Sequence, residues 1–546
     1  MASSMRIING RVYDPANNID GEIKEICIQD GKIVDSVADD ATIIDAQGMV
    51  IMPGGVDIHC HIAGPKVNAA RKLQPEDHRH DVHPSTPFTR SGTGGTVPST
   101  FATGYRYATL GYTTAMEAAV TPIGARHTLE EFHDTPVIDK GFYVLLGNNI
   151  FLQNLLREQR YEEFDQAVAW WISSTKGYTV KLVNPGGDEP WKGKRNSNVA
   201  DIDEKKDDEL TPRKIIESFI KTVDKLGFPH PPHIHCNNLG HSGNYTTTLE
   251  TMKTAGDLRA HIAHIQFHSY GGELGKNPVS KAAEIIDYVN NNPNITCDVG
   301  QVMFGKSTIM TADAPLAYVL KGISNTKWVN ADTECESGCG IVPFSYQEHI
   351  YMHTLQWAIG LELFLLSKDP WRVILSTDHP NGGSFMSYPK LIKLLMDKSF
   401  RREEMKRVNQ KALDKCSLRD LEREYTLNEI AIITRAGPAK ALGLHNKGHL
   451  GVGADADITI YDEMDDKEMM FNAPRYVIKS GNSIIENHEF KNDFIGKLLH
   501  IAPEYDQKIE EIVKPFFENY YSIEFSNYAV DDRYLHDHEI IATGKS

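Results

Sequence analysis

Two different periods of apolar and polar residues divide the chain. Near the N-terminus, residues 6–13, 25–29 and 32–34 read as short strands, and Asp30 and Gly31 between the last two form a typical hairpin turn. Alternate side chains of a strand lie on one face, so such segments can cover a core on one side only. The first 50 or so residues are therefore predicted to form a small β unit.

From about residue 51 the pattern changes to apolar stripes at helical spacing that alternate with short apolar strands. Thr211 is a suitable N-cap, Pro212 suits the first helical position, and an apolar stripe then precedes a strand at 232–236. The same helix–strand order recurs at 158–183 and at 279–299. Repeated units of this kind predict a parallel sheet, and over about 370 residues a closed (β/α)8 barrel is the leading candidate.

Short β signals return near residue 445. Residues 448–461 combine a glycine-rich turn with an alternating strand, and residues 476–486 have the pattern of a hairpin. We expect these strands to pair with the N-terminal ones and to build one small β-sandwich domain from both chain ends. The predicted α/β organisation is 1–52 and 431–490 for the β domain, 53–430 for the barrel and 491–546 for a C-terminal extension.

The composition limits the partners and the compartment. The net charge of −17 argues against nucleic acid as a main partner, because a phosphate-binding protein needs a basic face. Seven cysteines are an odd number at low density, which fits a reducing cytoplasm better than a disulfide framework. Cys335 and Cys339 are expected to be free thiols rather than half of a metal site, because no second pair lies nearby.

No segment has the character of a signal peptide or a membrane span. The N-terminus lacks a basic stretch followed by an apolar run, and no uninterrupted apolar stretch approaches about 18 residues. The most apolar segment, 357–366, contains Glu362 and is predicted to be a buried helix. We therefore expect a cytoplasmic protein without a membrane span.

Two strands introduce residues with metal chemistry. His59 and His61 alternate on one strand, so both imidazoles lie on one side and can share a divalent metal, although such a pair alone is weak evidence. Lys181 lies within an apolar strand at 178–183, where an unpaired ammonium is costly to bury. It is expected either to form a buried salt bridge or to react with carbon dioxide, giving an anionic carbamate that can bridge two cations.

Histidines are dense on two further predicted strands. His233 and His235 share a face of the first, and His264 and His268 share a face of the second, at 261–268. Single buried histidines are usually structural, but two strands with two such pairs are harder to explain in that way.

An acidic residue completes the series. A short apolar strand at 373–375 leads to Asp378, and the C-terminal ends of the strands form the catalytic face of an α/β barrel. Asp378 can bind a metal and accept a proton from metal-bound water. The order is His-x-His, Lys, His, His, Asp, each near a strand end, in a chain that begins and ends with β segments.

This order resembles the amidohydrolase superfamily, which includes dihydroorotases, hydantoinases and urease. Residues 52–61 (MPGGVDIHCH) and 448–458 (GHLGVGADADI) resemble its N-terminal and C-terminal motifs. A closer resemblance is to the family of A subunits of formylmethanofuran dehydrogenase. The segments that carry this resemblance are 99–107, 111–114, 125–128, 131–136, 176–181, 235–240, 266–271, 311–313 and 520–528.

The resemblance implies a dinuclear metal site. His59 and His61 would bind the first metal, His235 and His264 the second, Lys181 as a carboxylysine would bridge both, and Asp378 would be the remaining ligand and the general base. Zinc suits four histidines, a carbamate and a carboxylate. His235 is favoured over His233 because the family's His-Cys-Asn motif begins with the ligand. Whether His264 or His268 is the ligand stays open.

The resemblance also implies a reaction and partners. The family interconverts formate plus methanofuran with N-formylmethanofuran plus water, beside iron–sulfur subunits and a tungsten or molybdenum subunit, or beside a formyltransferase subunit. One alternative is a free-standing cyclic-amide hydrolase of the dihydropyrimidinase or hydantoinase type, which shares the metal site. Another is a non-catalytic scaffold subunit, but the complete set of candidate ligands argues against it.

Overall fold

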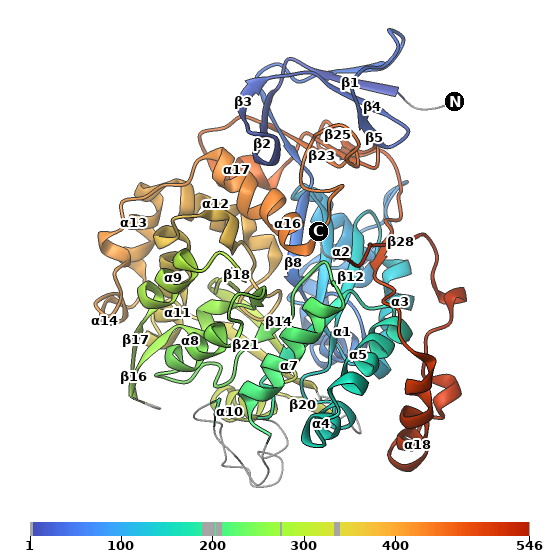
Figure 1. Cartoon of the computed structure of the whole chain (residues 1–546). Coiled ribbons are helices and arrows are strands. Elements are labelled where there is room, and N and C mark those ends of the chain that lie inside the picture. The colour runs from blue at the N-terminus through green and yellow to red at the C-terminus, as the bar shows by residue number, and fades with distance from the viewer. Residues whose placement is uncertain (1–3, 188–201, 204–209, 274–275, 332–338, 545–546) are drawn as a thin grey trace.

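Eight parallel strands form a barrel at the centre of the protein (Figure 1). The computed structural model describes residues 4–187, 202–203, 210–273, 276–331 and 339–544. The barrel order follows the chain, and a parallel bridge between Cys60 and His379 joins the last strand's end to the first strand. The strands are β8 (Gly55–Cys60), β11 (Tyr112–Val120), β12 (Asp139–Leu145), β13 (Thr179–Val183), β14 (His233–His235), β15 (Ala260–Ile262), β18 (Ile295–Asp298) and β22 (Val373–Ile374). The predicted barrel is confirmed.

Helices cover the outside of the barrel between successive strands. Helix α7 begins as expected, because the Thr211 side chain accepts a hydrogen bond from the Lys214 N–H and Pro212 occupies the first position. The segment at 357–366 lies in a buried helix, as predicted. The main covering helices are α3 (Ala125–Asp134), α5 (Tyr161–Thr175), α7 (Pro212–Lys225), α8 (Tyr245–Thr254), α9 (Ala282–Asn291), α11 (Tyr351–Leu366) and α12 (Tyr388–Met396).

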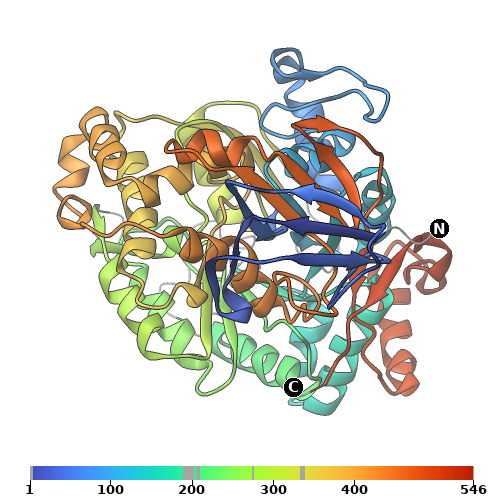
Figure 2. The same ribbon diagram turned by 90° about the horizontal axis from the view of Figure 1, so that it is seen from above.

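Both chain ends build the small β domain above the barrel (Figures 1 and 2). A four-stranded sheet has the order β5-β4-β1-β6, and a seven-stranded sheet has the order β26-β25-β24-β23-β7-β2-β3. In the larger sheet β7 (Met49–Pro53) pairs antiparallel with β23 (Ile458–Asp462), and β24 (Tyr476–Lys479) with β25 (Asn482–Glu486) forms the predicted hairpin. The remaining strands are β1 (Ser4–Ile8), β2 (Arg11–Asp14), β3 (Ile19–Ile23), β4 (Ile26–Gln29), β5 (Lys32–Val34), β6 (Thr42–Asp45) and β26 (Glu489–Phe490).

The C-terminal extension packs along one side of the barrel (Figure 1). Strand β27 (Leu498–His500) joins the end of β12, and helix α18 (Glu510–Tyr520) follows. Phe517 and Tyr528 from the extension contact the rings of Trp170 and Trp171 on α5. Aromatic side chains bury large areas, so this extension closes an apolar face of the barrel that α5 would otherwise expose.

Two segments differ from the sequence expectations, and two others lie wholly or mostly outside the described part. The second histidine segment is not a strand throughout, because β15 ends at Ile262 and a 3-10 turn occupies Ile265–His268. The helix expected from residue 279 begins only at Ala282, since the preceding residues form β17 (Lys276–Ser280). Cys335 and most of the charged stretch at 201–209 lie outside the described residues.

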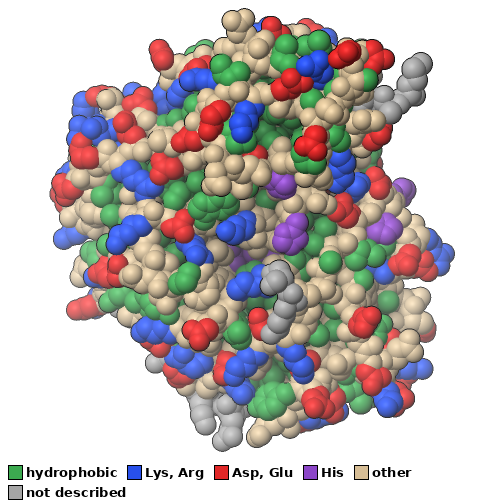
Figure 3. Space-filling view, turned by 45° about the horizontal axis from the view of Figure 1, so that its top comes forward, with side chains coloured by type: hydrophobic (Ala, Val, Ile, Leu, Met, Phe, Trp, Pro, Cys, Tyr) green, Lys and Arg blue, Asp and Glu red, His purple; other side chains and the backbone are tan. Residues whose placement is uncertain are grey.

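Charged side chains of both signs are mixed on the surface. Figure 3 shows lysine and arginine side chains interspersed with aspartate and glutamate over the face that it presents. Within the described ranges, no helix combines the length and the apolar character that crossing a bilayer requires.

Candidate active site

One cavity of about 1070 Å³ opens at the C-terminal ends of the barrel strands and collects the expected ligands. His59 and His61 come from the end of β8, and Lys181 from β13. His235 comes from β14, His264 from the turn after β15, and Asp378 from the segment after β22. Residues far apart in the sequence therefore meet at the face where α/β barrels carry out their chemistry.

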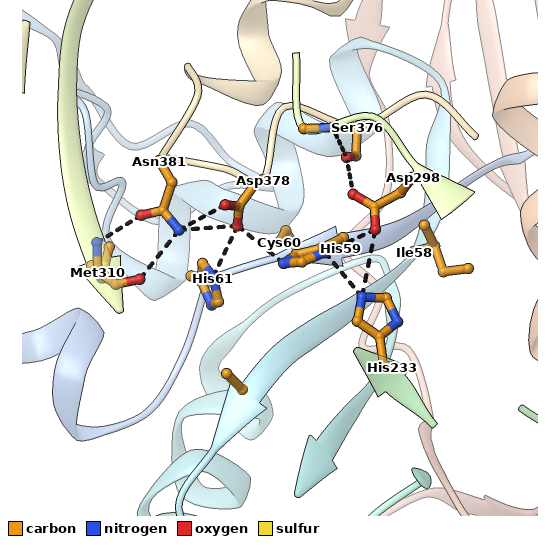
Figure 4. A network of polar contacts seen from close by, with 12 residues as sticks. Ile58, His59, Cys60, His61, His233, Asp298, Met310, Ser376, Asp378 and Asn381 are labelled. Atoms are coloured by element: carbon orange, nitrogen blue, oxygen red, sulfur yellow. Dashed lines mark hydrogen bonds and ion pairs between the residues drawn. The ribbon is translucent and has the colours of Figure 1, made fainter. Parts of the chain in front are cut away.

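Asp378 lies between the two histidines of the first strand (Figure 4). Its Oδ1 is 3.0 Å from His59 Nε2 and 3.1 Å from His61 Nε2. The Asn381 amide donates to both carboxylate oxygens at 3.0 Å and is held in turn by the backbone of Met310. Although burial favours the neutral acid, the neighbouring His59 and His264 hold the pKa of Asp378 well below its ordinary value. The carboxylate is therefore ionised and fixed in orientation.

Two buried acids orient the histidines from behind, and the sequence analysis did not identify either. Asp298 Oδ1 lies 3.1 Å from His59 Nδ1, and Glu117 Oε1 lies 3.0 Å from His61 Nδ1. Burial opposes the charge of Glu117, but Lys66 and His61 lower its pKa to about 2. Carboxylates in this position fix the tautomer of a metal-binding imidazole and keep its Nε2 lone pair free. Both residues could have been found from the sequence, because each is an acidic residue within an otherwise largely apolar barrel strand.

Lys181 is completely buried in the centre of the barrel. Its Nζ has no hydrogen-bond partner among the described residues, so the salt bridge considered from the sequence is absent there. Burial lowers the pKa of Lys181 to about 8, against the opposing effect of the Asp298 and Asp378 carboxylates. An amine with this pKa is partly neutral near pH 7, which is the form that attacks carbon dioxide.

The remaining histidines form a second group. His235, His264 and His268 each offer a ring nitrogen within 4.8 Å of the others, and all three are buried. The expected shared strand face of His264 and His268 is wrong: a single helical turn, not strand alternation, brings their rings to 5.2 Å. His264 has a φ of 33°, a left-handed conformation that ends the strand and begins this turn. The sequence of residues 261–268 is compatible with both strand and helical periodicity. It gives no indication of the left-handed conformation at His264.

The geometry distinguishes the two histidines. His264 belongs both to the group with His235 and to a second group with His59 and Asp378, and it lines the cavity. His268 belongs only to the first group. His233, the alternative to His235, points away from the cavity and contacts His59 Nδ1 and Asp298 instead.

The donor set fits divalent cations. Besides Lys181 Nζ, buried atoms without a hydrogen-bond partner in the described part of the chain include His264 Nδ1 and both ring nitrogens of His268. Leaving buried polar atoms unpaired is costly, and here they converge with imidazole and carboxylate donors at one place. Imidazole nitrogens and carboxylate oxygens are ligands that zinc and similar cations prefer.

Comparisons with known proteins agree with this architecture. Residues 42–485 match the amidohydrolase family. The chain is 44% identical to Protein FwdA of Methanocaldococcus jannaschii, over 98% of both chains. It is 39% identical to the A component of the formyltransferase/hydrolase complex Fhc of Methylorubrum extorquens, over 96% of both. The dihydroorotase of Aquifex aeolicus matches over only 10% of this chain.

A solved structure matches almost the whole chain. It is the formyltransferase/hydrolase complex (FhcABCD) from Methylorubrum extorquens in complex with methylofuran, with a TM-score of 0.93 and 36% identity over 99% of this chain and 100% of that one. The family resemblance seen in the sequence motifs is confirmed. The chain belongs to the amidohydrolase family, within the group that contains FwdA and the A component of Fhc, and is a metal-dependent amidohydrolase.

Proposed function

We propose that this protein interconverts N-formylmethanofuran plus water with formate plus methanofuran. The observation that carries the proposal is the convergence of His59, His61, Lys181, His235, His264 and Asp378 in one cavity, in a chain similar along its whole length to the A component of Fhc. The solved relative is a complex with methylofuran. Making or breaking a formamide C–N bond is the reaction that such a site suits.

The proposed metal site has two positions. His59, His61 and Asp378 would hold one zinc ion, His235 and His264 the other, and Lys181 would join them. Neutral Lys181 Nζ would attack carbon dioxide: a C–N bond forms, one C=O π bond of carbon dioxide breaks and one proton leaves, so the carbamate carries one negative charge shared by two oxygens. His264 is preferred to His268 because it lies in both groups of donors and lines the cavity. Cations held by these residues would supply Lewis-acid chemistry, lowering the pKa of a water molecule and polarising the formyl carbonyl.

Asp378 is the proposed general base. It lies at the cavity floor with its pKa held low, so it is ionised and able to accept a proton from the attacking water. As the C–O bond forms and the C–N bond breaks, the same carboxyl passes that proton to the departing amine. The products are formate and methanofuran, and the reverse sequence forms the amide. The Asn381 amide donates to both oxygens of Asp378 and so fixes the orientation of the carboxylate during proton transfer.

The cavity supports a carrier with an apolar section. Its walls above the polar floor include Leu316, Leu320, Phe344, Tyr346 and Met352. Such walls can bury an aromatic or furan ring and exclude bulk water around the reacting carbon. Binding energy from this part of the substrate would position the formamide over Asp378.

We also propose that the chain works as one subunit of a larger cytoplasmic complex. The solved relative belongs to the FhcABCD complex, whose name includes a formyltransferase activity. A formyltransferase subunit, or a tungsten or molybdenum subunit with iron–sulfur subunits, would supply or consume the C1 unit. Formate and methanofuran remain the small-molecule partners of this chain.

Formate release from N-formylmethanofuran tests the proposal directly. The purified chain, alone and in its native complex, is incubated with the formylated carrier, and formate is quantified over time. We expect metal-dependent release and no hydrolysis of hydantoin by the same preparation. Hydantoin hydrolysis without formate release would favour the cyclic-amide hydrolase, and zinc-containing protein without either activity would favour the scaffold role.

A further inference from the structure

A row of buried imidazoles leads from the cavity floor into the barrel. His59 Nδ1 lies 3.0 Å from His233 Nε2, and His233 Nδ1 lies 3.1 Å from His230 Nε2. At the far end His230 Nδ1 lies 2.6 Å from the carbonyl oxygen of Ala441. His230 and His233 are fully buried and do not line the cavity, so neither contacts substrate or takes part in the proposed proton transfer.

The carbonyl at the end of this row determines where each proton lies. A carbonyl oxygen only accepts, so His230 Nδ1 must donate to Ala441, and the Nε2 of a neutral His230 is then an acceptor. His233 Nδ1 must donate to that acceptor, which leaves His233 Nε2 without a proton. The hydrogen between His233 Nε2 and His59 Nδ1 therefore belongs to His59. Both rings are fully buried, and burial disfavours the charged imidazolium, in keeping with one proton on each ring.

The neighbouring groups satisfy the same assignment. Asp298 Oδ1 accepts from His59 Nδ1 at 3.1 Å and from His261 Nε2 at 3.2 Å. His261 Nδ1 then accepts from the Thr296 hydroxyl at 2.9 Å. The Ser376 hydroxyl donates to the other oxygen of Asp298 at 2.6 Å. With His59 protonated on Nδ1, its one hydrogen is shared between Asp298 Oδ1 and His233 Nε2, and every other contact named here has one donor and one acceptor. Figure 4 shows His59, His233, Asp298 and Ser376 in this network.

We propose that His230 and His233 are positioning residues that hold His59 in the tautomer with a proton on Nδ1 and a free lone pair on Nε2. That lone pair faces Asp378, where the proposed function places a cation, so this inference rests on the proposed metal site. Asp298 alone would attract the same proton. The contribution of His230 and His233 is that His233 Nε2 carries no hydrogen and so can only accept. If His233 donated from Nε2 instead, it would compete with His59 for Asp298 and force the proton of His59 onto Nε2.

Zinc affinity of the metal-free protein separates this role from simple packing. His233→Phe keeps a ring of similar size but removes both nitrogens, and we expect it to weaken zinc binding about tenfold, as loss of a partner behind a metal-binding histidine does. His233→Gln supplies a carbonyl acceptor towards His59 and an N–H donor towards His230, so it should stay within about threefold of the wild type. His500→Phe, at a buried histidine in the C-terminal extension, is the matched control and should leave zinc affinity unchanged.

The affinities are measured by competition with a chelator on the full chain, and the visible spectrum of cobalt-substituted protein and the thermal midpoint are recorded for each variant. Wild-type affinity and spectrum in His233→Phe would overturn the inference, as would equal losses in His233→Phe and His233→Gln. If His233→Phe does not fold, His230→Phe decides, because its ring can keep the stack on Tyr143. A weakened zinc affinity in His230→Phe supports the positioning role of His230 and His233, and an unchanged zinc affinity overturns it. Wild-type protein that binds no zinc would instead overturn the metal site itself.

Discussion

Two groups of buried ionisable side chains lie at opposite ends of the barrel. They differ in how far their buried charges and polar atoms are paired with one another. At the N-terminal end, below the β domain, Asp139, Asp455 and Asp457 surround the ammonium groups of Lys447 and Lys479. The contacts of Lys447 and Lys479 with these carboxylates range from 2.6 to 3.1 Å. In this group, here called the lysine–aspartate cluster, every charged side chain has a partner of opposite charge.

The group at the C-terminal end is different, because some of its polar atoms have no such partner within the described ranges. It contains imidazoles and carboxylates with one lysine, and Lys181 Nζ and the nitrogens of His268 lack partners among the described residues. The three aspartates of the first cluster lie close enough together to resemble a metal site, yet their lysines already occupy the place of a cation. The comparison teaches that proximity of acidic groups does not identify a metal site. Unpaired buried donors that converge on a cavity are the better indication.

Lys181→Ala is expected to have the largest effect. Without the bridging group, both metals and all formate release should be lost, and short carboxylates such as formate or acetate should restore part of each by filling the space. The matched control is Lys140→Met, which removes a buried lysine on the next strand whose Nζ binds two backbone carbonyls. That variant should be less stable but keep its metals. Full activity in Lys181→Ala would contradict the bridging role.

Lys479→Met tests the other cluster. It leaves Asp139 and Asp457 with one lysine fewer in a buried place, and breaking such a pair typically costs about 3–5 kcal/mol of the free energy of unfolding. Metal content should not change. Denaturant unfolding measures the loss, and Lys491→Met, which removes an exposed pair with Glu489 in the same domain, should leave the free energy of unfolding nearly unchanged. Loss of metal in Lys479→Met would show that the two ends of the barrel are coupled.

Asp378→Asn separates binding from chemistry. Most of the metal should remain, because the other five proposed ligands are intact and an amide oxygen still coordinates weakly. Formate release should fall roughly 100-fold or more, since an amide cannot accept the proton of the attacking water. Metal content, carrier binding and turnover are measured on one preparation, with Asp369→Asn, at a partly exposed helix cap, as the control. Normal turnover would move the base role to another residue, and loss of both metals would make Asp378 mainly a structural ligand.

Glu117→Gln should have the smallest effect of the four. The amide keeps the shape but weakens the hold on His61 Nδ1, so zinc affinity should fall by about 10–100-fold, while the fold remains. Glu362→Gln is the control, because Glu362 is also buried and its carboxylate accepts hydrogen bonds from Ser280 and Ser417, which do not line the cavity. Equal zinc affinities for the two variants would remove Glu117 from the site.

The features predicted correctly from the sequence are those that depend on local patterns of apolar and polar residues. The barrel, the pairing of both chain ends, and the strand ends that present His59, His61 and Asp378 all follow from alternation, caps and order along the chain. The turn at 265–268 was predicted wrongly, because its apolar spacing suits a strand equally well and a left-handed His264 has no signature in the text.

Other features depend on contacts between distant residues. Asp298 and Glu117 meet His59 and His61 only after the barrel closes, across 239 and 56 positions of sequence. The lysine–aspartate cluster joins residues from β12 and the C-terminal part of the β domain in the same way. Family resemblance supplied the proposed ligand set from the sequence alone, but it did not supply the acids and histidines behind those residues.

The metal content of the purified protein tests the central claim most directly. Elemental analysis of the chain, isolated without chelators, should give about two divalent ions per chain, with zinc as the main species. The Lys479→Met variant should give the same number, and Lys181→Ala should give close to none. A value near zero in wild-type protein that still releases formate would contradict the dinuclear site.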